Sequence, residues 1–418
     1  MQKKKVAASL FVAGALASPL AMATNGYFPI SYGVKSEGMG GVGIALPQDT
    51  LAAAVNPAGM VRVGDRADVG ITWFRPNRSA TISGNAIPGL NGDYSGNGRS
   101  NFFIPDLGYN KMISGDTSLG VSVYGNGGMN TQYNTNPFGA MGGSGAGGIN
   151  LAQLFVSPTW SMKINDSNSI GIAINLAYQM FSATGLQPFD NAIYSQSPGS
   201  VTNNGTDTST GVGIRVGWTG DVTSQVTLGA TYQPKTTMSK FSKYKGLFAN
   251  QGEFDIPATY GVGVAYKATP EFTAAFDITQ IQYAGVTAVG DSPTVPAQFG
   301  STNGPGFGWQ NMTVYKLGVA YQYEPDLTLR AGFNHNTQQI GTGTNVTFLN
   351  MLAPGVVQNH LTLGSTWKLA GKSELSLAYI HAFSQTVTGP IAGGAGGFGG
   401  GTASIKMSED SIGVMYGW

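Results

Sequence analysis

The sequence predicts an all-β protein, a transmembrane antiparallel β-barrel of about fourteen strands. Three observations predict this fold: an export signal, a low content of charged residues, and alternating strand-length runs joined by connections of two lengths. Only 10% of the residues are charged, against about a quarter in soluble domains, while 63 residues are glycine and 11% are aromatic. This composition suits a chain that faces lipid on one side.

The first residues resemble a secretion signal. Lys3, Lys4 and Lys5 form a basic patch, residues 6–20 form an apolar core, and Ala21-Met22-Ala23 is a small-x-small cleavage site. We therefore predict that residues 1–23 are a signal peptide. Removing its three lysines changes the formal net charge from +1 to −2. A chain with this charge is not expected to bind nucleic acid.

The chain contains no cysteine, which excludes disulfides and thiol chemistry. Beyond the signal, no run approaches the roughly 18 uninterrupted apolar residues of a helical membrane span. About fourteen alternating runs instead have the length of barrel strands. They cover residues 66–80, 100–111, 116–126, 151–165, 167–182, 207–220, 223–241, 254–267, 271–286, 310–323, 326–340, 357–369, 372–388 and 403–418.

The connections between these runs alternate in length. Those after even-numbered runs are tight, such as Ser114-Gly115-Asp116 and Gly220-Asp221. Those after odd-numbered runs are long and rich in Gly, Asn, Ser and Pro, such as residues 83–99 and 127–150. Short turns at one end and long loops at the other are typical of bacterial outer-membrane barrels.

Aromatic residues support the same fold. The last run ends with Val414, Tyr416 and Trp418 on one face, which resembles the C-terminal signal read by the outer-membrane assembly machinery. Four tryptophans lie near the run ends that face the short turns, where they would form a periplasmic girdle: Trp160, Trp218, Trp367 and Trp418.

Motifs for catalysis and cofactors are incomplete. Residues 38–43 match G-x-G-x-x-G, but no buried strand precedes them and they follow an export signal. His335, His360 and His381 have neither H-x-H nor H-E-x-x-H spacing. Ser384 lies near His381 without a nucleophile elbow or a partnered acid, so a lipid hydrolase is kept as an alternative only. We expect no cofactor, no metal and no enzymatic activity.

Three cations lie opposite in phase to the apolar residues of their runs. Arg215, Lys316 and Arg330 are therefore predicted to face the lumen, because a charge facing lipid costs about 2–4 kcal/mol at the midplane. They could pair with inward acids such as Asp277 or with a segment filling the lumen. Alternatively, one or two of them could hold the carboxylate of a ligand.

The long connection near residue 240 combines lysines with aromatic residues. Its apolar members are Phe241, Tyr244, Leu247 and Phe248, interleaved with Lys240, Lys243 and Lys245. Such a loop could contact lipopolysaccharide phosphates or collect amphipathic acids, or it could simply be solvated.

The stretch from Gly38-Met39-Gly40-Gly41 to Asn56-Pro57-Ala58 resembles the FadL-type family of outer-membrane transporters. Further similar stretches are "LAQLFVSPTW" (151–160), "YQMFSATGLQPF" (178–189), "KFSKYKGLF" (240–248) and "FDIPATYGVGVAYK" (254–267). The resemblance spans essentially the whole mature chain. The motif Asn56, Pro57 and Ala58 is by itself a weak signal for the family. Its position after a glycine-rich segment and before about fourteen strands makes the signal more specific.

The resemblance implies a fourteen-stranded barrel whose N-terminal segment folds inside as a hatch. On this basis we divide the chain into a signal peptide (1–23), a hatch (24–62) and the barrel (63–418). The family's third strand kinks inward and opens the wall, and Gly125, Gly127 and Gly128 could permit that break here. No motif places the family's carboxylate-binding residues, so the three cations remain lumen-phase candidates.

The resemblance further implies passive uptake of hydrophobic compounds, above all long-chain fatty acids, with lateral exit into the outer membrane of a Gram-negative bacterium. We expect a monomer whose partners are its hydrophobic substrate, outer-membrane lipid, lipopolysaccharide and, during biogenesis, the assembly machinery. The main alternative is a general diffusion porin or a structural outer-membrane barrel.

Overall fold

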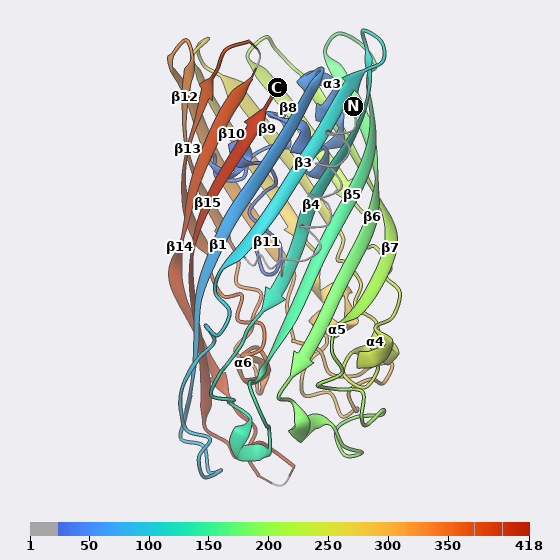
Figure 1. Ribbon diagram of the computed structural model, residues 1–418, viewed down its shortest axis with the longest axis vertical. Helices are drawn as coiled ribbons and strands as arrows, with labels where there is room; N and C mark the ends of the chain where they lie inside the picture. Colours follow the sequence, from blue (N-terminus) through green and yellow to red (C-terminus); the bar gives the residue numbers. More distant parts are fainter. Residues whose placement is uncertain (1–23, 372, 395) are drawn as a thin grey trace, which may run out of the picture.

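The computed structural model describes residues 24–371, 373–394 and 396–418 (Figure 1). The predicted signal peptide, residues 1–23, lies outside the described residues. One antiparallel sheet dominates the fold, and it closes on itself because the last strand pairs with the first from Asp68↔Gly417 to Ser83↔Thr402. The predicted closed antiparallel barrel is confirmed.

Fourteen strands form the wall of the barrel in the described part of the chain, each paired with its neighbours in sequence order. They are β1 (Arg66–Ser83), β3 (Phe102–Met112), β4 (Thr117–Asn130), β5 (Gly148–Lys163), β6 (Asn168–Thr184), β7 (Asp207–Asp221), β8 (Val226–Gln233), β9 (Thr259–Lys267), β10 (Phe272–Ile281), β11 (Met312–Glu324), β12 (Leu327–Asn336), β13 (Asn359–Lys368), β14 (Glu374–Pro390) and β15 (Thr402–Gly417). The short β2 (Gly92–Ser95) adds only a hairpin partner for the end of β1.

Each predicted run overlaps one of these strands, but several strands are shorter than predicted. The largest difference is in β8, which ends at Gln233 although the alternation continues to residue 241. Pro234 follows, and proline cannot donate a ladder hydrogen bond. Beyond it the chain leaves the wall and makes only isolated bridges, such as Thr236↔Ile256.

The two ends of the barrel differ as predicted (Figure 1). Short turns and the end of β15 lie at the top of the view, and long connections lie at the bottom with α4 (Ala249–Gly252), α5 (Thr287–Gly290) and α6 (Val346–Leu349). Four short 3-10 helices also belong to the long connections: η3 (Gly139–Met141), η4 (Gln187–Phe189), η5 (Ser242–Tyr244) and η6 (Tyr283–Gly285). None of the helices in the described ranges is long and apolar enough to cross a membrane.

Burial alternates along the strands as period two requires. In β6, for example, Ile172, Ile174 and Leu176 are exposed while Ala173 and Asn175 are buried. The outer face therefore presents a belt of apolar side chains, and the inner face combines polar and small side chains with buried aromatic ones such as Phe181. In a membrane, the first surface meets lipid and the second surrounds the lumen.

Residues 24–65, here called the N-terminal segment, lie inside the barrel (Figure 1). The segment contains α2 (Val34–Glu37), η1 (Thr50–Ala54), η2 (Pro57–Gly59) and α3 (Met60–Val63). These elements contact much of the wall: α2 packs on β13 to β15, η1 on β1 and β3 to β5, and η2 on β5 to β7. Most of the segment is buried, so it fills the lumen near the short-turn end.

Candidate functional site

The inner wall approaches the N-terminal segment through glycines. A Cβ atom at Gly332 would lie 2.1 Å from the backbone nitrogen of Gly40, and one at Gly217 would lie 1.8 Å from Asn56 Oδ1. Eleven glycines in ten wall strands would place an added Cβ within 3.0 Å of the segment, and we call them the glycine cradle: Gly108, Gly120, Gly171, Gly217, Gly229, Gly261, Gly263, Gly318, Gly332, Gly364 and Gly413. Sequence reasoning missed this feature, although lumen-phase glycines in most predicted strands could have revealed it.

The motif at Asn56, Pro57 and Ala58 fixes the segment to the wall. Asn56 Oδ1 accepts a hydrogen bond from the Ala58 backbone N–H at 3.1 Å and so caps η2, which Pro57 begins. Its Nδ2 donates to the carbonyl of Ile44 at 2.7 Å and to that of Trp218 in β7 at 3.0 Å. One side chain thus joins two parts of the segment to the barrel.

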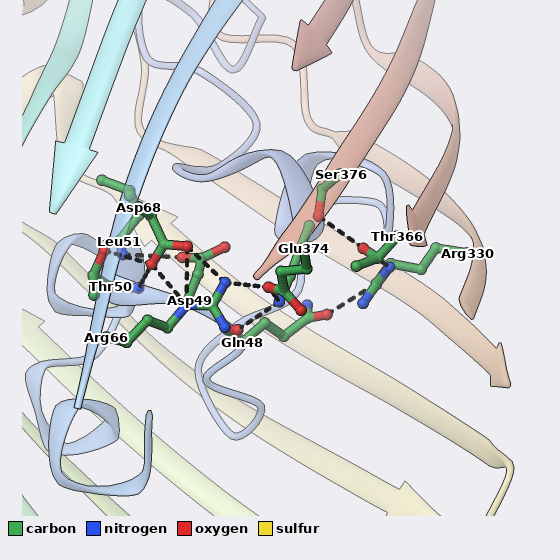
Figure 2. A network of polar contacts seen from close by, with 11 residues as sticks. Gln48, Asp49, Thr50, Leu51, Arg66, Asp68, Arg330, Thr366, Glu374 and Ser376 are labelled. Atoms are coloured by element: carbon green, nitrogen blue, oxygen red, sulfur yellow. Dashed lines mark hydrogen bonds and ion pairs between the residues drawn. The ribbon is translucent and has the colours of Figure 1, made fainter. Parts of the chain in front are cut away.

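A buried ionic cluster anchors the segment where the barrel closes (Figure 2). Arg66 of β1 contacts both Asp68 and Glu374 of β14, and Lys35 of α2 also pairs with Glu374. Asp68 in turn accepts hydrogen bonds from the Thr50 backbone N–H at 3.0 Å and its hydroxyl at 2.8 Å. These contacts reach across β15 and connect its two neighbouring strands to the segment.

Two carboxyl groups of the segment hold protons more tightly than usual. Burial raises the pKa of Glu37 to about 7, although a hydrogen bond from Thr72 opposes the rise. Burial and the nearby charge of Asp68 raise the pKa of Asp49 to about 6. Asp49 Oδ2 has no hydrogen-bond partner among the described residues. The charge of the segment therefore changes near neutral pH.

All three predicted lumen cations donate hydrogen bonds to the N-terminal segment. Lys316 Nζ reaches the carbonyl of Ile30 at 2.8 Å, and Arg215 reaches that of Val55 at 3.2 Å. Arg330 Nε donates to the Gln48 side chain at 3.0 Å, next to the ionic cluster (Figure 2). The structure thus brings Arg215 and Lys316 to one cavity and places Arg330 elsewhere.

That cavity, here called the lumen cavity, measures about 60 Å³. Besides the two cations, it is lined by residues of the segment and the wall, among them Asn25, Phe28, Tyr32, Asn126, Thr231 and Gln233. Two donors on its lining, Arg215 Nε and Gln233 Nε2, are buried without an acceptor among the described residues. An unsatisfied buried donor favours a ligand that brings an acceptor.

The wall is broken beside this cavity. The pairing of β3 with β4 stops at Leu107↔Val123, and a bulge follows between Gly125 and Gly127. From residue 124 to residue 130, β4 pairs with β5 alone, and the Gly128 N–H donates to the carbonyl of Tyr27 in the segment at 2.9 Å. The three predicted kink glycines therefore lie at an inward bend of β4, which we call the wall gap.

Apolar side chains close the wall gap from both sides. Phe74 of β1, Phe102 and Ile104 of β3 and Ala152 of β5 form one buried apolar cluster, although β4 lies between β3 and β5 in the sheet order. A cluster that reaches past a strand is possible because β4 has turned inward at this level.

The predicted capture-loop residues are brought together at the long-loop end. Phe241, Tyr244 and Phe248 are buried around Phe181 of β6, with ring centroids 4.6 to 5.7 Å from its ring. Leu247 and Phe248 line a nearly all-apolar cavity, here called the loop cavity. Its other walls include Ile149, Phe181, Phe189, Phe299, Phe307 and Leu352.

The residues considered for catalysis or metal binding do not form such a site. His381 shares a hydrogen bond with Asp410 at 2.9 Å, but in the described part of the chain no hydrogen bond joins Ser384 to either residue. Nor do three or more His, Cys, Asp or Glu side chains group there in a way that could hold a metal ion.

A closed fourteen-stranded barrel with an apolar outer face and an internal segment is an outer-membrane β-barrel. The family described as "Outer membrane protein transport protein (OMPP1/FadL/TodX)" matches residues 31–391. The chain belongs to this family, whose members are transport channels of the outer membrane rather than enzymes.

Solved structures show the same fold. The P. putida toluene transporter TodX is 18% identical, with a TM-score of 0.66 over 93% of this chain and 98% of that one. A Pseudomonas aeruginosa FadL homologue is 17% identical, with a TM-score of 0.70 over 94% and 99%. The Ralstonia pickettii toluene transporter TbuX is 17% identical, with a TM-score of 0.62 over 93% and 98%. No curated protein matches the chain.

Proposed function

We propose that this barrel takes up hydrophobic compounds passively, that its substrates are long-chain fatty acids, and that they leave sideways through the wall. The wall gap is the main observation in support of lateral exit. It offers an apolar way out through the wall where the N-terminal segment occupies the lumen. A hydrocarbon chain gains about 0.8 kcal/mol per CH₂ on leaving water, so a direct path into lipid favours its delivery.

The proposed route uses the sites described above. Phe241, Tyr244, Leu247 and Phe248 belong to the capture site at the loop cavity. Residues 24–62 act as the hatch, held by Asn56, Pro57 and Ala58, and residues 63–418 act as a monomeric barrel. The inward bend at Gly125, Gly127 and Gly128 provides the exit.

The lumen cavity supports an acid as the substrate. Arg215 and Lys316 both line it, and Arg215 Nε has no acceptor among the described residues. Arg215 also donates to the Val55 carbonyl and to Gln233 Oε1, and Lys316 donates to the Ile30 carbonyl. A carboxylate entering the cavity would satisfy the free donor and compete for the others, because charge-assisted hydrogen bonds are about twice as strong as neutral ones.

Aromatic hydrocarbons are the second candidate substrates. Two of the similar structures are described as toluene transporters, and phenyl rings of Phe181, Phe189, Phe248, Phe299 and Phe307 surround the loop cavity. Such a cavity can bind a ligand that has no charged head group.

Uptake of labelled oleate and labelled toluene by cells that depend on this barrel separates the two candidates. We expect Arg215→Gln with Lys316→Gln to slow oleate uptake about tenfold or more, the worth of a charge-assisted hydrogen bond, and to leave toluene uptake unchanged. Equal oleate uptake by the variant and the wild type would remove the carboxylate role of these cations. Uptake of toluene alone would favour the second candidate.

The porin alternative makes the opposite prediction for the hatch. Deleting residues 38–60 should raise the conductance to polar solutes if the segment is a hatch, and should leave it unchanged in a general diffusion porin. A deletion strain that grows normally on every hydrophobic carbon source but poorly on sugars would overturn the proposed function.

A further inference from the structure

A second buried arginine lies at the wall gap, on the other side of the N-terminal segment from the lumen cavity. Arg78 of β1 is 2% exposed, and its guanidinium donates to the backbone carbonyls of Asn130 and Arg99. It also lies over the ring of Phe102, 5.9 Å from the centroid. Its Nε has no acceptor among the described residues. Arg78 thus spans the wall gap and keeps one donor free.

This arginine lines a cavity at the gap, which we call the gap cavity. Its lining includes Phe74, Phe102, Met129, Trp309 and Met407, so it is mostly apolar. Gly26 of the N-terminal segment is on its lining, whereas the adjoining Asn25 and Phe28 line the lumen cavity. The segment therefore borders both cavities.

A buried carboxyl group accompanies Arg78 without binding it. Glu409 of β15 is 2% exposed, and neither of its carboxylate oxygens has a hydrogen-bond partner among the described residues. It lies opposite Pro76 in the register, and Arg78 lies opposite Met407, so the two side chains are diagonal neighbours on the inner wall. They interact electrostatically, yet no ion pair within 4 Å joins them in the described residues.

We propose that Arg78 and Glu409 form a second polar site, beside the wall gap, that holds the carboxyl head of a hydrophobic acid with one proton shared between ligand and Glu409. This proposal rests on the proposed uptake of hydrophobic compounds. It adds a binding site between the lumen cavity and the lipid. Arg78 Nε donates to one ligand oxygen, and the other ligand oxygen shares the proton with Glu409.

The proton count follows from electrostatics. Two carboxylates facing each other in a buried site repel, so one of them is protonated when a ligand is bound. The proton passes from Glu409 to the ligand carboxylate by breaking one O–H bond and forming another, and the remaining charge on Glu409 faces Arg78. The ligand is then neutral, and a neutral acid enters hydrocarbon at far lower cost than an ion. A long-chain alcohol fits the same pair, because its hydroxyl accepts from Arg78 and donates to Glu409.

Carbon NMR of [1-¹³C]oleate bound to the detergent-solubilised full-length protein tests this site. Glu409→Gln is the main variant, because it keeps the side-chain shape and breaks no hydrogen bond found in the structure. Asp410→Asn is the matched control, since it removes the neighbouring carboxylate, which is paired with His381 instead. Arg78→Gln is less direct because it also loses the contacts with Asn130 and Arg99.

We expect a bound carboxyl resonance whose titration differs from that of free oleate in the wild type and in Asp410→Asn. In Glu409→Gln, the carboxyl group of oleate should titrate as it does in free oleate, or oleate should bind this site about tenfold more weakly. An unchanged resonance in Glu409→Gln would overturn the site.

If the wild type binds no oleate at all, the fatty-acid part of the proposed function fails. The Arg78–Glu409 site is then tested with [1-¹³C]oleyl alcohol. A bound signal that Glu409→Gln shifts supports the site, and a signal that is absent or unaffected overturns it.

Discussion

Lys35 in α2 forms an ion pair with Glu374 in β14, and both side chains are largely buried, at 6% and 14% exposure. The pair fixes the N-terminal segment to the seam where the barrel closes, because β14 and β1 flank β15. We expect Glu374→Gln to remove the negative charge that pairs with Lys35 and Arg66. Breaking a buried ion pair costs on the order of 3–5 kcal/mol.

Planar-bilayer recordings check this prediction. Glu374→Gln should open to small ions more often than the wild type, since the segment is held less firmly. Glu324→Gln, an exposed carboxylate at the end of β11, is the control and should behave like the wild type. Indistinguishable recordings for all three proteins would contradict an anchoring role for the cluster.

The stability of the folded barrel should fall as the pH rises from about 4.5 to about 7. Burial raises the pKa of Glu37 from 4.5 to about 7, so between these values the folded protein keeps a proton that the unfolded chain has lost. Folding stability from this group is complete below about pH 4.5, declines up to about pH 7, and is constant above it. Asp49, with its pKa raised to about 6, acts in the same direction.

Denaturant unfolding at pH 5 and pH 8 measures this effect. Because other groups also titrate, the informative quantity is the difference in unfolding free energy between the wild type and Glu37→Gln. We expect the wild type to lose more stability than the variant on going from pH 5 to pH 8. Equal losses would show that Glu37 does not titrate in this range.

The glycine cradle should tolerate no side chain. A Cβ at position 332 would meet backbone atoms of Met39 and Gly40, which cannot rotate away. We expect Gly332→Ala to destabilise the protein by about 1–3 kcal/mol, as overpacking does, and to raise the leak of small solutes. Gly115→Ala is the matched control, because nothing lies within 4 Å of its Cβ position. Equal melting temperatures for the two variants would argue against a tightly fitted segment.

Strand number, closure and loop asymmetry could be predicted from the sequence because each depends on local patterns. Period-two alternation marks each strand, and turn residues mark its ends. The end of β8 was missed since alternation continues past Pro234, where the ladder stops. The inward bend of β4 was expected from the family resemblance, with its glycines as the residues that permit it, but its contact with Tyr27 depends on a segment about 100 residues away.

The candidate site was less accessible to sequence reasoning. Phase alone placed Arg215, Lys316 and Arg330 in the lumen, yet it could not say which two share a cavity. Arg78 and Glu409 were not singled out, because their relation appears only when β15 pairs with β1 and closes the barrel. Alternation determines the face of a residue, whereas its neighbours depend on closure and on the fold of the N-terminal segment.

A reversible cross-link across the wall gap shows whether the substrate leaves the barrel there. Ile104 of β3 and Gly125 of β4 suit the cross-link, since a Cβ at position 125 would lie 3.0 Å from Ile104 Cγ2. The chain has no cysteine of its own, so Ile104→Cys with Gly125→Cys introduces a single pair. Ala331→Cys with Leu363→Cys, opposite each other on β12 and β13, is the control pair in the intact wall.

The measurement is the rate of oleate uptake under oxidising and reducing conditions. We expect oxidation to stop uptake by the protein with the gap pair and reduction to restore it, whereas uptake by the protein with the control pair should respond to neither. Undiminished uptake with the gap cross-link formed would contradict lateral exit.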